Sequence, residues 1–185
     1  MSLLSYNRLC ELVARNVITN VKKEHINSSS IDITLGGKIM RESIPTSLYD
    51  PRRIVSLKER DPLRMDEIIL EDDDRILIAP GDFILAQSEQ IFNLPNNISA
   101  EYKLKSSMAR IGLEHMNAGW CDAGWNGSVL TLEFKNMTNK HIIALDKGVA
   151  IGQVVFFEHE PVPDDRSYAA RGRYNNDKTV QGIKP

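Results

Sequence analysis

The first twenty residues carry apolar side chains at three- and four-residue intervals, which is the spacing of one face of an α-helix. The apolar positions are Leu9, Leu12, Val13 and Val17. Ser5 precedes them and is a residue type that caps helix starts well. We therefore predict an N-terminal helix that begins after Ser5 and ends near residues 16–20.

Beyond this helix the apolar residues take the alternating period of β-strands. Residues 31–35 alternate between aliphatic and polar side chains, and Gly36 and Gly37 are expected to break the run. Residues 41–75 are charged and interrupted by prolines, so they predict a long excursion with one or two short strands. Short apolar runs lie within it at 54–55 and 68–70.

From residue 76 to residue 157, short apolar runs alternate with turn signals. The runs are 76–78, 83–86, 129–134, 142–143, 149–151 and 154–157. Strands separated by turns every ~8–12 residues are typical of a β-sandwich, jelly roll or barrel. We therefore predict a mainly β fold.

Composition and charge exclude several classes of protein. The chain has 185 residues, with 23 basic and 25 acidic side chains and a formal net charge of −2, which argues against bulk electrostatic binding to nucleic acid. Its longest stretch without a charged residue, 90–100, is shorter than the ~18 apolar residues that a membrane span needs. The start of the chain shows no signal-peptide pattern. Cys10 and Cys121 are expected to be reduced thiols in a cytoplasmic compartment.

The last twenty residues differ from the rest in composition. Residues 166–185 hold five basic side chains against one acid, Asp177, with two tyrosines and little aliphatic content. We predict one β domain over residues 1–165, followed by a flexible segment that forms a lid over an anionic ligand. A frayed terminus is the alternative.

The segment that begins at Lys105 has the pattern of a helix start that can bind an anion. Ser106 and Ser107 stand before helix-compatible residues and predict a short helix near 106–112. Free backbone N–H groups at a helix start suit phosphate, and Lys105 and Arg110 add positive charge. The alternative is an ordinary capped turn with solvated lysines.

Residues 117–127 combine three glycines with both tryptophans of the protein. Glycine allows close backbone approach, and the indoles of Trp120 and Trp125 offer flat apolar walls. This combination suits a hairpin that holds a planar ring such as a base, with Asp122 accepting a hydrogen bond from a sugar hydroxyl. A structural turn with buried tryptophans is the alternative.

Glu133 is the candidate for acid–base chemistry. It shares a strand face with Val129 and Thr131 and is predicted to be partly buried. A buried carboxylate costs free energy unless it is paired, and Arg110 is the natural partner. A held, ionised carboxylate is a competent general base for water. A surface glutamate on an edge strand is the alternative.

Motifs for other nucleotide chemistries are missing from the sequence. The four histidines show no metal-ligand spacing, and the zinc signature of nucleobase deaminases, H-x-E with a later P-C-x-x-C, is absent. GxxxxGK[ST] and GxGxxG are absent too. We therefore expect any water activation to use a carboxylate and no zinc.

Six segments in order resemble the dCTP deaminase branch of the dUTPase-like trimeric family. The segments are 29–36, 79–83, 105–113, 118–127, 132–134 and 148–156. The resemblance implies a distorted jelly-roll β fold and a homotrimer whose subunits share active sites. It also implies hydrolytic deamination of dCTP to dUTP and ammonia, within pyrimidine deoxynucleotide metabolism. It implies no zinc, and Mg²⁺ that is bound with the triphosphate.

The resemblance assigns roles to individual residues. Glu133 resembles the family's general base and Arg110 the arginine that holds it, while Ser106 and the carbonyl of Ala118 resemble the groups that position the water. The other matches are substrate contacts: Lys105, Ser107, Asn117, Asp122, Trp125, Gln153, Tyr168, Arg173, Tyr174 and Lys178. The spacing from Gly127 to Glu133 is one residue longer than the family's, and a β-bulge could absorb the extra residue.

Four functions remain open at this point. The first is a dCTP deaminase that releases dUTP, which the set of Ser106, Arg110 and Glu133 favours. The second is a bifunctional enzyme that continues to dUMP and pyrophosphate with Asp122. The third is a dUTP diphosphatase only. The fourth, from another class, is a non-catalytic nucleotide-binding protein. For an enzyme of this family, dTTP is a possible inhibitor.

Overall fold

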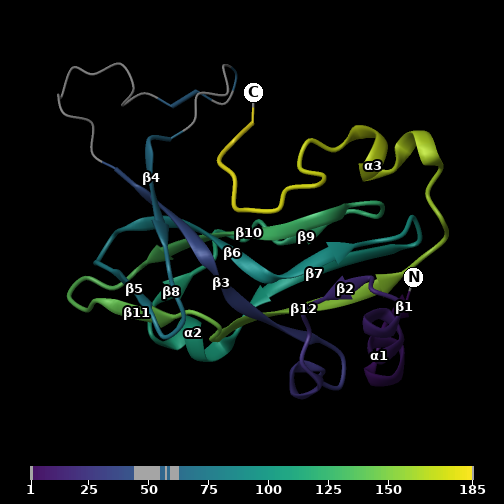
Figure 1. Cartoon of the computed structure of the whole chain (residues 1–185), viewed down its shortest axis with the longest axis horizontal. Helices are drawn as coiled ribbons and strands as arrows, with labels where there is room; N and C mark the ends of the chain where they lie inside the picture. Colours follow the sequence, from purple (N-terminus) through teal and green to yellow (C-terminus); the bar gives the residue numbers. More distant parts are fainter. Residues whose placement is uncertain (1, 44–54, 57, 59–62, 185) are drawn as a thin grey trace.

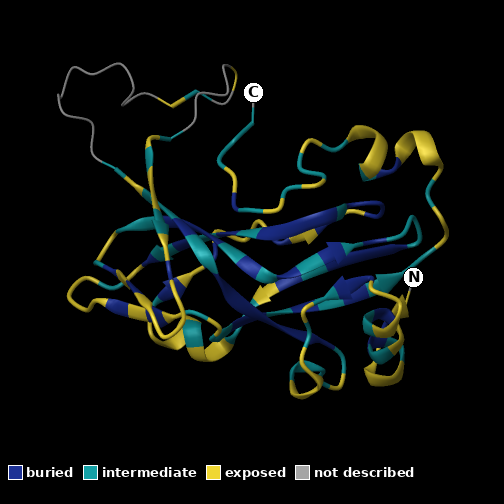
Figure 2. Ribbon diagram, viewed as in Figure 1, coloured by how far each residue is buried: buried dark blue, intermediate teal, exposed yellow. Residues whose placement is uncertain are grey.

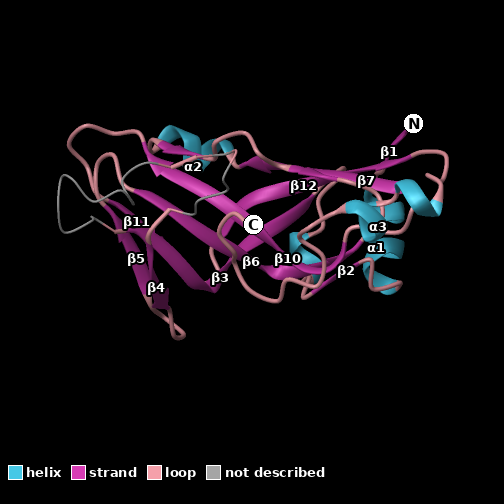
Figure 3. Ribbon diagram, turned by 90° about the horizontal axis from the view of Figure 1, so that it is seen from above, coloured by secondary structure: helices cyan, strands magenta, loops and turns pink. Residues whose placement is uncertain are grey.

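The structure is a computed structural model, and it describes residues 2–43, 55–56, 58 and 63–184. Most of the described strands belong to one antiparallel sheet that curls into a half-barrel (Figures 1 and 3). Its strands follow one another in the order β8 (Leu113–Glu114), β10 (Asn126–Asn136), β6 (Phe83–Asn93), β3 (Ile31–Glu42), β12 (Ala150–Glu158), β7 (Ile98–Leu104) and β9 (Trp120–Cys121).

Shorter strands extend this sheet at three places. The pairs are β1 (Ser2–Leu3) with β12, β2 (Ile18–Thr19) with β6, and β4 (Met65–Ile69) with β3. A separate two-stranded sheet consists of β5 (Arg75–Ile78) and β11 (Ile143–Asp146). The prediction of a mainly β fold is therefore confirmed.

Short helices lie around the sheet. They are α1 (Tyr6–Ala14), α2 (Ser106–Arg110) and α3 (Tyr168–Arg171), with 3₁₀ turns η1 (Lys23–His25) and η3 (Asp164–Arg166). The predicted N-terminal helix begins after Ser5, as expected, but ends at Ala14, because Asn16 takes a left-handed φ of 58°. Val17 is therefore buried beyond the helix rather than on its face. None of the described helices has the length and apolar content to cross a membrane.

The strand that begins at Ile31 does not end at the two glycines, contrary to the sequence expectation. β3 continues through Gly36 and Gly37 to Glu42. A Cβ on Gly36 would lie 2.8 Å from the side chain of Gln87 on β6. The glycine therefore permits close strand approach inside the sheet, where the sequence suggested a break.

The core lies inside the curl of the sheet, where Figure 2 shows the strands mostly buried. On β10 the alternation is clear, because Leu130, Leu132 and Phe134 are buried in the core while Glu133 belongs to the other face. The sequence analysis places no strand at β7, yet Ile98–Leu104 pairs with β12 along its length. The two apolar runs at 149–151 and 154–157 belong to one strand, β12. The run at 54–55 lies partly outside the described residues.

The C-terminal segment packs against β10 (Figures 1 and 3). The backbone N–H of Val129 donates to the carbonyl of Asp177 at 2.9 Å, and the N–H of Val180 donates to the side chain of Gln87 at 3.0 Å. Val180 is 1 % exposed. The C-terminal segment therefore contributes one residue, Val180, to the core. Its composition did not suggest this, because a single valine changes the composition of twenty residues very little.

Candidate active site

A cavity of about 610 Å³ lies between β10, the glycine- and tryptophan-rich residues 117–127 and the C-terminal segment. It brings together five of the residues that the sequence analysis selected: Glu133, Asp122, Trp125, Tyr168 and Tyr174. Aliphatic and aromatic side chains from β4 and β6, including Met65, Phe83 and Leu85, form much of its wall. A partly apolar cavity with a few converging polar groups is the usual form of a small-molecule site.

Glu133 lines this cavity from β10, whose pairing with β6 is irregular at two places before it. The pairing shifts by one residue between Asn126 and Ser128, where Gly127 is the extra residue, and its φ of 66° is one that glycine adopts without strain. The pairing shifts again between Val129 and Thr131, where β6 carries the extra residues. A bulge therefore lies at the start of residues 127–133, and the longer spacing of this segment stays a prediction.

The carboxyl group of Glu133 is buried without a hydrogen-bond partner at Oε2 among the described residues. Burial disfavours the charged form and raises the pKa of Glu133 to about 7. A base with a pKa near neutrality can accept a proton and return it within one catalytic cycle. The geometry therefore agrees with the acid–base role predicted for this side chain.

Two buried aromatic side chains lie behind Glu133, and the sequence analysis missed both. His115 Nε2 is 3.6 Å from Glu133 Oε2, and burial lowers the pKa of His115 to about 4, so its imidazole is neutral. The ring of Tyr102 packs on that imidazole with centroids 4.4 Å apart. Glu133 therefore faces a neutral, mostly apolar wall inside its own chain. A lone histidine without ligand spacing gave no signal of this contact.

Residues 117–127 do not form the hairpin that the sequence analysis predicts, because β9 pairs with β7 while β10 pairs with β6 and β8. Trp125 is 7 % exposed and stacks on Phe92, with ring centroids 5.2 Å apart. Its indole N–H donates to the carbonyl of Tyr174 at 2.7 Å, which ties residues 117–127 to the C-terminal segment. Asp122 is exposed and accepts a hydrogen bond from Trp120, which also lines the cavity. Residues 117–127 thus contribute one carboxylate and two indole rings to the cavity.

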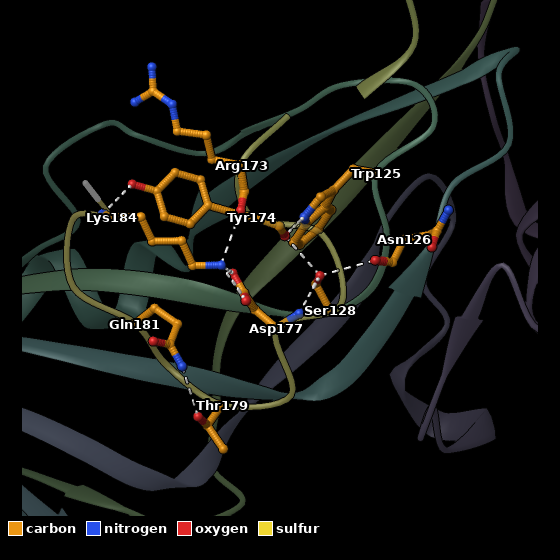
Figure 4. A network of polar contacts seen from close by, with 9 residues as sticks. All are labelled: Trp125, Asn126, Ser128, Arg173, Tyr174, Asp177, Thr179, Gln181 and Lys184. Carbon is orange, nitrogen blue, oxygen red and sulfur yellow. Dashed lines mark hydrogen bonds and ion pairs between the residues drawn. The ribbon is translucent and has the colours of Figure 1, made fainter. Parts of the chain in front are cut away.

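A network of polar contacts holds the C-terminal segment over the cavity (Figure 4). The Ser128 hydroxyl donates to the carbonyl of Tyr174 at 2.9 Å and accepts from the backbone N–H of Asp177 at 3.1 Å. Lys184 Nζ lies 2.8 Å from Asp177 Oδ2 and 5.2 Å from the centre of the Tyr174 ring. The ion pair of Asp177 and Lys184 therefore holds residue 184 against the earlier part of the C-terminal segment.

We expect Lys184→Met to loosen this closure, because it leaves the largely buried Asp177 carboxylate unpaired at a cost of about 1–2 kcal/mol. Amide hydrogen exchange at Val129, whose N–H donates to the Asp177 carbonyl, reports the opening. Lys178→Met is the matched control, since Lys178 is an exposed lysine of the same segment. Equal exchange rates in the two variants would contradict the role given to Lys184.

The remaining candidates lie away from this cavity. Ser106, Ser107 and Arg110 are exposed on α2, which Figure 1 shows apart from the C-terminal segment. Arg110 forms no ion pair with Glu133 inside this chain, because β10 and α2 present the two groups in different places, and the predicted pairing stays a prediction. Five further candidates do not line the cavity: Asn117, Ala118, Gln153, Arg173 and Lys178.

Lys105 and Gln153 lie beside β3. Lys105 Nζ pairs with Asp32 Oδ2 at 2.8 Å, and Asn27 donates to the other oxygen of the same carboxylate at 2.8 Å. The hydroxyl of Ser30 donates to Gln153 Oε1 at 3.2 Å. The ammonium predicted to contact phosphate is thus already engaged inside the chain. Among the described residues no three His, Cys, Asp or Glu side chains come close enough to hold a metal ion.

The sequence was compared with models of known protein families. Residues 3–159 match the family model described as dCTP deaminase-like. The chain therefore belongs to the dCTP deaminase family of enzymes, in agreement with the resemblance seen in its motifs.

Curated relatives and a solved structure refine the placement. A protein of Coprothermobacter proteolyticus is 32% identical over 187 residues, covering 98% of this chain and 90% of the relative. One of Methanospirillum hungatei is 36% identical over 138 residues, covering 74% and 70%. Both are named dCTP deaminase, dUMP-forming.

The 2′-deoxycytidine 5′-triphosphate deaminase of Agrobacterium tumefaciens superposes with a TM-score of 0.64 at 21% identity. The match covers 83% of this chain and 47% of that one. It confirms the dUTPase-like β fold predicted from the sequence and does not bear on substrate.

Proposed function

We propose that this protein converts dCTP to dUMP, pyrophosphate and ammonia in two hydrolytic steps. The observation that carries the proposal is that Glu133 and Asp122, the two carboxylates expected to serve the two steps, line one cavity. The name of the relatives supports it as well. The sequence analysis ranked release of dUTP first and formation of dUMP second, and the relatives favour the second.

In the first step Glu133 takes a proton from water, and the water oxygen attacks C4 of cytosine. The proton passes to N3, and a second transfer through Glu133 lets the C4 nitrogen leave as ammonia. One water is consumed, and dUTP remains in the cavity. In the single chain burial raises the pKa of Glu133 to about 7, and Arg110 of a second copy would favour the carboxylate that takes the proton from water.

In the second step Asp122 accepts a proton from another water, whose oxygen attacks phosphorus. The bond between the α-phosphorus and its bridging oxygen breaks, and the electron pair leaves with pyrophosphate. Mg²⁺ bound with the triphosphate would supply positive charge that stabilises the leaving pyrophosphate. The C-terminal segment, with Tyr168, Arg173, Tyr174 and Lys178, closes over the phosphates, and no zinc takes part.

The active site is completed by a second copy of the chain in a homotrimer. In the part of the chain that the structure describes, Glu133 is a largely buried carboxylate without a paired cation, and Arg110 is an exposed cation without an ion pair. A neighbouring copy would bring Arg110 to Glu133, with Ser106 and the Ala118 carbonyl positioning the water. Ile111, 48 % exposed beside α2, offers apolar area for such a contact.

The titration of Glu133 tests this sharing. In Arg110→Ala we expect Glu133 to titrate near pH 7, the value set by burial alone, and in the wild-type assembly clearly lower, because a guanidinium favours the carboxylate. Carboxyl ¹³C NMR gives the midpoints, and Glu133→Gln identifies the signal. Equal midpoints in the two proteins would contradict a shared site.

The proposed function is tested by incubating the protein with dCTP and Mg²⁺, measuring ammonia and separating the nucleotides. We expect ammonia and dUMP in equal amounts, with pyrophosphate. Accumulating dUTP would establish the deaminase alone, and cleavage of added dUTP without ammonia would establish a diphosphatase. No reaction in either case would favour a nucleotide-binding protein. Parallel reactions with added dTTP test whether dTTP inhibits the enzyme. We also propose that the enzyme acts in the cytoplasm.

A further inference from the structure

Trp120 is an exposed tryptophan beside the proposed hydrolytic carboxylate. Its indole Nε1–H donates to Asp122 Oδ1 at 2.8 Å, and both side chains line the cavity. Trp120 is 56 % exposed, which is a large apolar surface to leave in water. The hydrogen bond is charge-assisted if Asp122 is ionised, and such bonds are among the stronger ones in proteins.

The indole is held in place from two sides. Trp120 belongs to β9, whose backbone pairs with β7 through Glu101, so the start of the side chain is fixed by the sheet. The ring then stacks on Phe157 of β12, with centroids 6.3 Å apart and planes 25° apart. A donor fixed by both its backbone and its ring has a defined direction, which an exposed lysine or serine would lack.

We propose that Trp120 is a positioning residue for the hydrolysis of the triphosphate. Its N–H occupies Oδ1 of Asp122, so Oδ2 is left to accept the proton of the attacking water. Breaking the bond between α-phosphorus and bridging oxygen then releases pyrophosphate, as in the proposed second step. The inference rests on the proposed function, since it assigns Trp120 to that step through Asp122.

Deamination should depend on Trp120 much less. Glu133 lies on β10 with its Oε2 3.6 Å from His115 Nε2, and no hydrogen bond or ion pair joins it to Trp120 among the described residues. A substitution that removes only the indole N–H should therefore separate the two steps. Trp120→Phe keeps an aromatic ring for the stack on Phe157, and Trp120→His restores an N–H donor on a smaller ring.

The experiment measures two rates for each variant: ammonia release from dCTP, and pyrophosphate release from dUTP. For Trp120→Phe we expect kcat for dUTP cleavage to fall about tenfold, the effect of losing one hydrogen bond to a charged group. Ammonia release should change less than about twofold, so dUTP should accumulate from dCTP. Trp120→His should recover part of the cleavage rate and lower the accumulation.

Asp122→Asn separates failure of this inference from failure of the proposed function. If Asp122→Asn abolishes dUTP cleavage and Trp120→Phe leaves it unchanged, the positioning role is overturned and the proposed function stands. If both rates fall equally in Trp120→Phe, the residue is structural or binds the base, and the positioning role is again overturned. If the wild type cleaves no dUTP, or Asp122→Asn cleaves it normally, the role of Asp122 fails and the inference fails with it.

Discussion

Glu133→Gln is expected to release no measurable ammonia from dCTP, a loss of about 10³-fold or more, because an amide cannot take the proton from water. The fold should persist, since the side chain keeps its shape and a neutral amide is cheaper to bury than a carboxylate. Ammonia release measures the first effect and thermal unfolding the second.

Glu114→Gln is the control for Glu133→Gln. Glu114 is an exposed glutamate on β8, the strand that pairs with β10 beside the site. The Glu114→Gln variant should deaminate dCTP at the wild-type rate. Full activity in Glu133→Gln would contradict the mechanism, and loss of activity in both variants would assign the effect to the sheet rather than to the carboxylate.

Mixed trimers give the second large effect. Glu133→Gln and Arg110→Ala should each be inactive alone, because every site lacks one group. Mixing unfolded chains in equal amounts and refolding them should restore about a quarter of the wild-type ammonia release, the share of sites that receive both groups from different copies. Subunits that do not share sites would stay inactive.

Each parent variant, refolded alone and mixed with wild type, controls for the yield of refolding. Size-exclusion chromatography shows whether the mixture assembles. Restored activity in a monomeric fraction would contradict the shared site, since one chain keeps Glu133 and Arg110 apart. The mixed trimers therefore test whether Arg110 of one copy acts with Glu133 of another.

The sequence predicted the parts of the site that depend on local pattern. Alternation along β10 predicted Glu133 on the face opposite the core. The glycine and tryptophan content of residues 117–127 predicted that this segment lines a cavity, which it does, although it is not a hairpin. Local period and turn chemistry are sufficient for such features.

Contacts between distant parts of the chain were not predictable. No pattern joins His115 to Glu133 or Trp120 to Asp122, because the first depends on the turn after β8 and the second on the direction of one indole. Gly36 was predicted to break the strand because its close approach to Gln87 of β6 joins positions that are far apart in the sequence. Arg110 was predicted to pair with Glu133 from residue type alone, because the sequence does not show that α2 and β10 hold the two side chains apart within one chain.

The choice between dUTP and dUMP as product was also beyond the sequence. The sequence analysis assigns Glu133, Arg110 and Ser106 to the first step and Asp122 to the sugar, and these roles are the same for both products. We expect the second step to depend on where the phosphates lie relative to Asp122, and thus on the arrangement of the C-terminal segment. The contacts of Trp125 and Ser128 with Tyr174 show that this arrangement is set by tertiary structure.

The central claim is that one cavity carries dCTP through to dUMP. The most direct test is a rapid-quench time course with base-labelled dCTP and Mg²⁺, run with and without excess unlabelled dUTP. The account predicts labelled dUMP that rises together with ammonia and is not reduced by the unlabelled dUTP. Label that accumulates as free dUTP, or dUMP that loses its label to the added dUTP, would contradict it.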